Sequence, residues 1–436
     1  MSTRDHELPL RCATAGSVDD GKSTLIGRLL FDTDTIFADQ LTHVTDVSQR
    51  QGKTEADLSL LTDGLRAERE QGITIDVAWR FATTPLRRFI LADAPGHVQY
   101  TRNALTAAST ADVLLVLVDP TKATDGLLPQ TRRHLAAGLF LGVPNVVIVV
   151  NKMDAVGFSH EAFVRAREWA SDYASKSPLS VGRPRTALQF FPVSALSGDN
   201  VVRASTRMPW FDGPTLYAHL AELPPTTRAV GEARFTVQWV QRPRTGGAGR
   251  RRYVGTLSSG TLRVGERMRI AASGLTSRVE SLETLDDALD DVRSASPREH
   301  VHAGQSVTLT LSDELDVSRG DVLLPEASKL EPTRDVELDL AWVGRESLSA
   351  GASLLLKHGA KKVRATVDAI VRIYDVESHV ARPADTLRLN DFGRVRLRTS
   401  EPLAWAPYAQ SREGGRAILI SRGNADTVAA AIYRAT

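Results

Sequence analysis

The sequence predicts an α/β domain with a doubly wound, mostly parallel sheet, followed by two small antiparallel β-barrels. Three observations support this fold class: a phosphate-loop (P-loop) motif at residues 16–23, an alternation of strand-like and helix-like segments up to about residue 223, and short strand-like segments with turn signals beyond it. We expect the three domains at residues 1–225, 229–326 and 332–436.

The first domain is indicated by unbroken apolar runs at residues 113–118 and 146–150, which are typical of parallel strands covered on both faces. Further strands are expected at residues 9–15, 77–81 and 88–92, and helices at residues 98–108, 130–140 and 161–175. In such sheets ligands bind beyond the carboxyl ends of the strands, so polar residues that directly follow a strand are candidates for the site.

The rest of the chain is predicted to be rich in strands. Residues 223–227 contain two prolines and predict a linker, after which strands are expected at 235–240 and 254–257. A second proline-bounded break, at residues 325–332, precedes another strand-rich region. There residues 336–342 alternate with period two, as half-buried strands do.

The composition is that of an ordinary soluble protein, with 42% hydrophobic and 24% charged residues. A net charge of +2 argues against a nucleic-acid partner, and a single cysteine, Cys12, excludes an internal disulfide. The short polar N-terminus lacks a signal peptide, and no apolar run reaches the roughly 18 residues of a membrane span. We expect a cytoplasmic protein with no membrane association.

Three polar clusters outside the first domain have alternative interpretations. Arginines within residues 242–252 surround a glycine-rich segment, which favours a mobile basic hairpin tip over a nucleic-acid patch. The acidic stretch 283–291 is interpreted as a solvated face rather than a metal site. His300 and His302 would need further ligands to bind a metal.

The P-loop motif is G-x-x-x-x-G-K-[S/T], whose backbone N–H groups surround the phosphates of a nucleotide. Gly16 and Gly21 allow close backbone approach, Lys22 supplies a charge for the β- and γ-phosphates, and Ser23 offers a hydroxyl to Mg²⁺. The helix expected to begin near Lys22 points its positive end at the same phosphates. The predicted phosphate-binding residues are Gly16, Ser17, Val18, Asp19, Asp20, Gly21, Lys22, Ser23 and Thr24.

Two further stretches match the magnesium and γ-phosphate side of a nucleotide site. Asp93 and Gly96 follow a strand, as a magnesium-side aspartate and a γ-phosphate-sensing glycine should. Thr74 lies upstream, in Gly72–Ile75, and offers a second hydroxyl. The predicted Mg²⁺ ligands are therefore Ser23, Thr74 and Asp93.

Base recognition is predicted from two stretches that follow strands. The carboxylate of Asp154 can accept hydrogen bonds from N1–H and the exocyclic amine of guanine, which adenine does not offer in that arrangement. A backbone N–H from residues 194–196 would reach guanine O6. The predicted base-binding residues are Asn151, Lys152, Asp154, Ser194, Ala195 and Leu196. All five stretches together indicate a GTPase domain with GTP and Mg²⁺ as cofactors.

Hydrolysis requires a group that orients water in line with the γ-phosphate. His97 follows Gly96 directly and is the candidate for that role; Lys22 and Thr74 complete the predicted catalytic set. A GTP-binding regulatory module that has lost hydrolysis is an alternative, against which the presence of these residues argues.

The chain resembles the translational-type GTPases, in which a GTPase domain precedes two β-barrels as in elongation factor Tu. Within that group Asp20 stands where elongation factors carry a histidine. The chain resembles the GTPase (CysN-type) large subunit of bacterial sulfate adenylyltransferase over nearly its whole length. Besides Asp20, five sequence segments carry this resemblance: residues 62–77, 95–103, 130–134, 194–202 and 209–216.

This resemblance implies a division of labour in a hetero-oligomer. Adenylyl transfer from ATP to sulfate would belong to a small ATP-pyrophosphatase-type (CysD-type) partner subunit, while this chain binds and hydrolyses GTP. An elongation-factor-like translational GTPase is the alternative, disfavoured by Asp20, by residues 99–103 and by the near-neutral charge. The chain departs from the family pattern at Ala94 and, in the last barrel, at Ser421, which leaves open a copy that serves a specialised sulfation pathway.

Overall fold

The computed structural model describes most of the chain in two units. The described residues are 9–36, 38–50, 57–61, 76–97, 101–123, 125–179, 187–224, 231–242, 250–284 and 296–434. The first unit comprises residues 1–226 with 376–380, and the second comprises residues 227–375 and 381–436. The domain boundaries expected from the sequence stay predictions.

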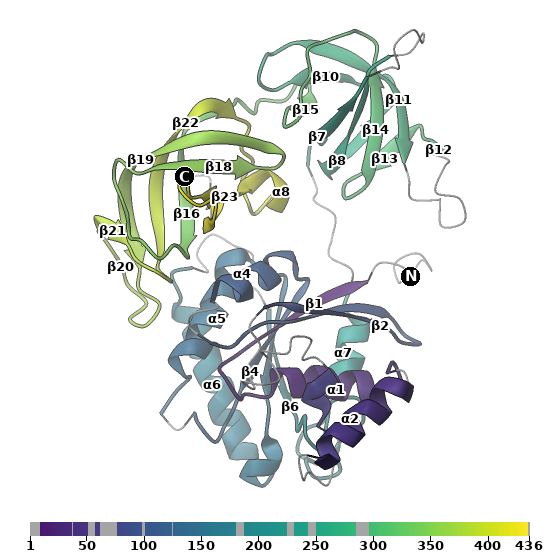
Figure 1. The fold of residues 1–436 in the computed structure, drawn as a ribbon, viewed down its shortest axis with the longest axis vertical. Helices are drawn as coiled ribbons and strands as arrows, with labels where there is room; N and C mark the ends of the chain where they lie inside the picture. Colours follow the sequence, from purple (N-terminus) through teal and green to yellow (C-terminus); the bar gives the residue numbers. More distant parts are fainter. Residues whose placement is uncertain are drawn as a thin grey trace. The chain divides into compact units, whose positions relative to one another are not determined.

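A six-stranded sheet forms the centre of the first unit (Figure 1). Its strands are β1 (Leu10–Ala15), β2 (Ala78–Thr83), β3 (Arg88–Asp93), β4 (Val113–Val118), β5 (Asn145–Val150) and β6 (Ala187–Pro192). The order is β2-β3-β1-β4-β5-β6, with β2 antiparallel to β3 and every other pair parallel. The doubly wound, mostly parallel sheet is therefore confirmed.

Helices cover both faces of this sheet (Figure 1). They are α1 (Lys22–Asp32), α2 (Ala38–Arg50), α4 (Thr101–Thr110), α5 (Pro129–Leu141), α6 (His160–Lys176) and α7 (Leu216–Glu222), with short 3₁₀ turns η1 (Leu58–Leu61) and η3 (Met153–Val156). Leu25 and Leu29 of α1 and Leu220 of α7 pack into one core with inward residues of the strands. Because β4 and β5 are buried along almost their whole length, their sequences are continuous apolar runs.

The second unit contains two closed antiparallel barrels of six strands each. The first barrel has β7 (Arg234–Gln241), β8 (Arg252–Ser259), β10 (Arg267–Ile270), β11 (Thr276–Thr284), β14 (Ser306–Leu311) and β15 (Val322–Pro325), and β10 pairs with β11 to close it. Three short strands accompany it: β9 (Thr261–Arg263), β12 (Ser296–Pro297) and β13 (His300–His302).

The second barrel closes through the pairing of β18 with β19. Its strands are β16 (Thr333–Trp342), β18 (Ser353–His358), β19 (Lys361–Tyr374), β22 (Phe392–Leu403), β23 (Arg416–Ile420) and β24 (Thr427–Tyr433), accompanied by β17 (Leu348–Ser349), β20 (Ala381–Arg382), β21 (Thr386–Leu387) and the short helix α8 (Arg412–Gly415). Both barrels have a single apolar core, which confirms the predicted architecture.

A seam joins the two barrels within this unit. Arg234 of the first barrel is buried and donates through Nη2 to the carbonyl oxygen of Ala404 in the second, at 2.5 Å. Ala404 also packs with Val322 and Leu324 in a small apolar cluster. The barrels are therefore linked by both a charged and an apolar contact.

Strand β16 differs from the half-buried strand that its alternating sequence predicts. From Leu338 to Trp342 every residue is buried, including Asp339. The carboxylate of Asp339 is tolerated inside because Arg394 binds it at 2.8 Å and Arg434 at 2.6 Å. The period-two pattern is confirmed for the barrel core, to which Leu338, Leu340 and Trp342 contribute. The other face of this half of the strand is buried rather than exposed, because the ion-paired Asp339 lies on it.

Of the arginine-rich, acidic and histidine clusters noted in the sequence, only the histidine pair lies wholly within the described residues. Residues 243–249 and 285–295 lie outside the described residues, whereas Arg250, Arg251 and Arg252 form ion pairs with Glu280, Glu314 and Glu283. The rings of His300 and His302 lie 5.0 Å apart, and the described residues contain no cluster of three His, Cys, Asp or Glu that could hold a metal. In the same described ranges no helix has the length and apolarity to cross a membrane.

Candidate nucleotide-binding site

The predicted site residues lie just beyond the carboxyl ends of four strands. The P-loop follows β1, residues 93–96 end and follow β3, residues 151–154 follow β5, and residues 194–196 come shortly after β6. Because β3, β1, β4, β5 and β6 run parallel, these ends share one edge of the sheet. The fold therefore brings together stretches that are up to 180 residues apart in the sequence.

Lys22, at the start of α1, lies against the P-loop itself. Its Nζ donates to the carbonyl oxygens of Ser17 at 2.7 Å and Gly16 at 3.2 Å. Burial lowers the pKa of Lys22, while the carboxylates of nearby aspartates, Asp93 first among them, oppose that shift. Gly96 lies against Lys22 and the P-loop, since a Cβ at position 96 would be 2.5 Å from Lys22 Nζ and 2.8 Å from the Gly16 carbonyl oxygen.

The proposed magnesium ligands Ser23 and Asp93 already contact one another. Ser23 Oγ donates to Asp93 Oδ2 at 2.7 Å, and Thr14 Oγ1 donates to Asp93 Oδ1 at 3.1 Å. A hydroxyl and a carboxylate side by side form the oxygen donor set that Mg²⁺ prefers, so these residues fit the ion. Thr74, the third predicted ligand, lies outside the described residues.

Two side chains support the P-loop from within. Asp20 is fully buried, and its Oδ2 accepts a hydrogen bond from Ser17 N at 2.7 Å. His134 on α5 accepts through Nδ1 from Gly16 N at 2.9 Å. Burial raises the pKa of Asp20 to about 6 and lowers the pKa of His134 to about 3, so the imidazole is neutral at pH 7. This role of His134 was not predicted from the sequence.

Asn151 links the P-loop to the predicted base-binding loop. Its Nδ2 donates to the Asp20 carbonyl oxygen at 2.8 Å, and its Oδ1 accepts from Ala195 N at 2.9 Å. Ser194 Oγ donates to Asp154 Oδ1 at 2.5 Å, which orients the carboxylate assigned to guanine. Both loops are thereby tied to the end of β5.

A second connection at this edge was not predicted from the sequence. Lys152 Nζ forms an ion pair of 2.8 Å with Asp119, which directly follows β4. Burial alone would raise the pKa of Asp119, but hydrogen bonds from Lys152 and Thr121 outweigh it and hold that pKa below its ordinary value. The position of Asp119 after a buried strand, like that of Asp93, was the available signal.

The remaining predicted residues border this arrangement. His97 directly follows the buried Gly96 and is exposed. In the P-loop, Val18 and Thr24 are half-buried and Asp19 is exposed with a left-handed φ of 63°. Leu196 is 62% exposed, next to the buried Ser194 and Ala195.

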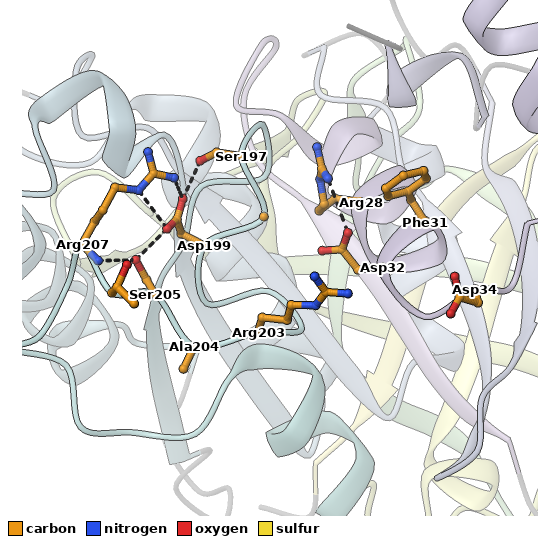
Figure 2. A pocket seen from close by; sticks show the side chains of 12 residues that line it. Arg28, Phe31, Asp32, Asp34, Ser197, Asp199, Arg203, Ala204, Ser205 and Arg207 are labelled. Atoms are coloured by element: carbon orange, nitrogen blue, oxygen red, sulfur yellow. Dashed lines mark hydrogen bonds and ion pairs between the residues drawn. The ribbon is translucent and has the colours of Figure 1, made fainter.

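A cavity of about 560 Å³ lies behind the base-binding loop (Figure 2). Arg28 and Asp32 of α1 line one side, and Asp199 with Arg207 lines the other. Asp199 accepts hydrogen bonds from Ser197, Ser205 and Arg207, and these hold its pKa below the ordinary value against the effect of burial. This cavity has charges of both signs and is separate from the P-loop.

Comparison with known proteins agrees with this arrangement. The family of the elongation factor Tu GTP-binding domain matches residues 9–289, and the GTP-eEF1A C-terminal domain-like family matches residues 335–434. Among solved structures, the S. cerevisiae Ski7 GTPase-like domain bound to GDP and inorganic phosphate is similar, with a TM-score of 0.52 over 99% of this chain and 98% of that one. At 18% identity this last likeness shows the fold alone.

Fold, site and family matches define a GTPase of the elongation factor Tu class, a class that uses GTP with Mg²⁺. Sulfate adenylyltransferase subunit 1 of Citrobacter koseri is 44% identical over 438 residues, which cover 100% of this chain and 88% of the relative. The protein of the same description from Salmonella arizonae is 43% identical, with 100% and 87% covered. The chain belongs to the sulfate adenylyltransferase subunit 1 family.

Proposed function

We propose that this chain hydrolyses GTP to support the formation of adenosine 5′-phosphosulfate and pyrophosphate from ATP and sulfate by a small partner subunit. The observation that carries the proposal is the full-length similarity to sulfate adenylyltransferase subunit 1, supported by the position of the P-loop, Asp93, Asn151 and Asp154 at one sheet edge. The partner is of the ATP-pyrophosphatase (CysD-like) type, and the hetero-oligomer works in the cytoplasm.

The roles of the residues follow from their chemistry. Lys22 places its charge against the β- and γ-phosphates, and the P-loop N–H groups surround them. Ser23, Asp93 and Thr74 would hold Mg²⁺, which when bound neutralises charge on the phosphates. His97 orients the attacking water, so the protein contributes mainly positioning.

Base selection is assigned to Asp154, whose carboxylate is oriented by Ser194. This carboxylate accepts from N1–H and the 2-amino group of guanine. Its replacement by an amide leaves a donor where guanine also has a donor, and favours xanthine, which has an oxygen at position 2. GTP affinity of Asp154→Asn should fall roughly 10- to 100-fold while XTP affinity rises.

This exchange gives a test of coupling in the intact complex. The chain is co-purified with the small-subunit candidate, and pyrophosphate release from ATP plus sulfate is measured with GTP or with XTP. The wild-type complex should respond to GTP, and the Asp154→Asn complex should respond to XTP, because the ATP site on the partner is unchanged. A pair that forms no adenylylsulfate under any of these conditions would overturn the proposal.

A further inference from the structure

The backbone of the loop 194–198 has one N–H group that stands apart from the rest. Ser194 N donates to Asp199 O, Ala195 N to Asn151 Oδ1, and both Ser197 N and Gly198 N to Ser194. Among the described residues no acceptor faces the N–H of Leu196. The predicted contact to guanine O6 therefore falls to Leu196, since the N–H of Ala195 is already engaged.

Arg28 of α1 holds the peptide group that carries this N–H. Its Nε donates to the Ala195 carbonyl oxygen at 3.1 Å, and its Nη2 donates to the Leu196 carbonyl oxygen at 2.5 Å. Asp32, one turn further along α1, forms an ion pair with Arg28 Nη1 at 3.4 Å (Figure 2). The guanidinium is thus fixed on both sides, with only 17% of the Arg28 side chain exposed.

Because the peptide group is planar, the hydrogen bond from Arg28 to the carbonyl oxygen also fixes the direction of the N–H in the same group. The carbonyl of Ala195 and the N–H of Leu196 belong to the same planar group and, in the trans form, point in opposite directions. The described part of the chain contains no cis peptide bond. Fixing the carbonyl oxygen on the Arg28 side therefore directs the N–H away from α1, and the charged donor also polarises the group.

We propose that Arg28 is a positioning residue for base recognition, which presents the Leu196 N–H to the 6-oxygen of guanine. This inference rests on the proposed function, because it needs a guanine nucleotide in the site. Helix α1 would then contribute to both parts of the site: Lys22 and Ser23 at its start bind the phosphates and Mg²⁺, and Arg28, almost two turns later, orients the peptide that binds the base.

The test compares two nucleotides that differ at one atom. GDP offers an oxygen at position 6, whereas 6-thio-GDP keeps N1–H and the 2-amino group but offers sulfur, a weak acceptor. Dissociation constants of both are measured by calorimetry for the full chain and three variants. Arg28→Met removes every donor at similar length, and Arg28→Lys keeps the charge but has one donor nitrogen in place of the two that Arg28 uses. Arg203→Met is the matched control, because Arg203 lines the same cavity, whereas the hydrogen bonds to this peptide come from Arg28.

The proposal expects Arg28→Met to weaken GDP about tenfold and 6-thio-GDP less than about threefold. Arg28→Lys should lie between wild type and Arg28→Met, and Arg203→Met should match wild type. Equal losses for the two nucleotides in Arg28→Met would overturn the proposal, because they would assign Arg28 a general structural role. Undiminished GDP binding in a folded Arg28→Met would overturn it as well.

A failure of the proposed function would give a different binding result from a failure of the Arg28 proposal. If the wild-type chain binds GDP no better than ADP, guanine recognition itself is absent, whatever Arg28 does. If Arg28→Met unfolds, Arg28→Lys still decides, since a partial loss for GDP that is smaller for 6-thio-GDP supports the inference and an identical loss for both rejects it.

Discussion

The predicted base-binding end and phosphate-binding end of the site differ in the partners to which their polar side chains form hydrogen bonds. At the base end, hydrogen bonds of Asn151 and Ser194 join separate loops into a frame. At the phosphate end, Lys22 and Ser23 bond to groups within the site, the loop carbonyls and Asp93. Hydrogen bonds at the base end therefore connect three loops, whereas those at the phosphate end connect the groups assigned to phosphate and Mg²⁺.

The largest expected effect belongs to a phosphate-end residue that acts on turnover. His97→Ala should reduce the rate of GTP hydrolysis by about 10²- to 10⁴-fold, because the attacking water loses its orienting group, while GTP affinity changes less than about twofold. Single-turnover hydrolysis and equilibrium binding measure the two quantities. His300→Ala, an exposed histidine of β13, is the control, and unchanged turnover in His97→Ala would remove His97 from the mechanism.

Removal of the phosphate-end charge should act on binding. Lys22→Met should lower the affinity for GTP roughly 100-fold, since it deletes a charged donor to the phosphates. The loss should be similar for GTP and XTP in the Asp154→Asn background, because Lys22 does not read the base. A loss that depends on the base would contradict the separation of the two ends.

A smaller effect is expected when the frame of the base end is broken. Asn151→Ala removes the link between the Asp20 carbonyl and Ala195 N, and should weaken GTP binding about tenfold. Asn145→Ala is the matched control, because Asn145 begins the same strand and bonds to the Asp112 carbonyl at 3.1 Å. Both variants should lose about 1 kcal/mol of stability, whereas only Asn151→Ala should lose affinity.

The last predictions concern the pH dependence of stability. The unfolded chain protonates His134 near pH 6.5, but the folded pKa is about 3, so this group makes stability fall as the pH drops from 6.5 towards 3. Asp20 acts in the opposite sense: its folded pKa of about 6 exceeds its ordinary 3.8, so stability falls as the pH rises from 3.8 to 6. Between pH 3.8 and 6 the two contributions oppose one another.

Single variants should separate these contributions. Urea unfolding of the nucleotide-free chain between pH 4 and 7 should show a steeper loss on acidification for Asp20→Asn than for wild type. It should show a shallower loss, or a gain, for His134→Gln. Each slope difference should be at most about 1.4 kcal/mol per pH unit, and parallel curves for all three proteins would contradict the assignment.

The sequence predicted elements with local patterns well. The apolar runs of β4 and β5 and the helices α5 and α6 lie within one residue of their expected bounds. The helix expected from residue 98 is described only from Thr101, and neither α2 nor α7 was predicted. α7 has only seven residues and therefore a weak signal, whereas α2 is amphipathic and no more polar on average than α6, so its pattern was present in the sequence and was overlooked.

The site shows a similar limit. Motif residues could be predicted because their spacing reflects chemistry shared with other phosphate-binding loops. Arg28 and His134 were missed because they act through side-chain contacts with loops more than 100 residues away, which a single sequence does not reveal. Asp119 directly follows a buried strand and could have been predicted from that position. Asp339 was missed in the same way, because only the fold brings two arginines to it.

The contact between the two barrels limits which domains of this protein can be exchanged for those of a relative. Arg234 is 3% exposed and depends on a carbonyl oxygen of the other barrel, so a chimera that replaces one barrel alone must supply an acceptor at the same place. Without it the buried guanidinium would lose a hydrogen bond from a charged donor, at about 1.5–3 kcal/mol. The two barrels are therefore best exchanged together, as one cassette.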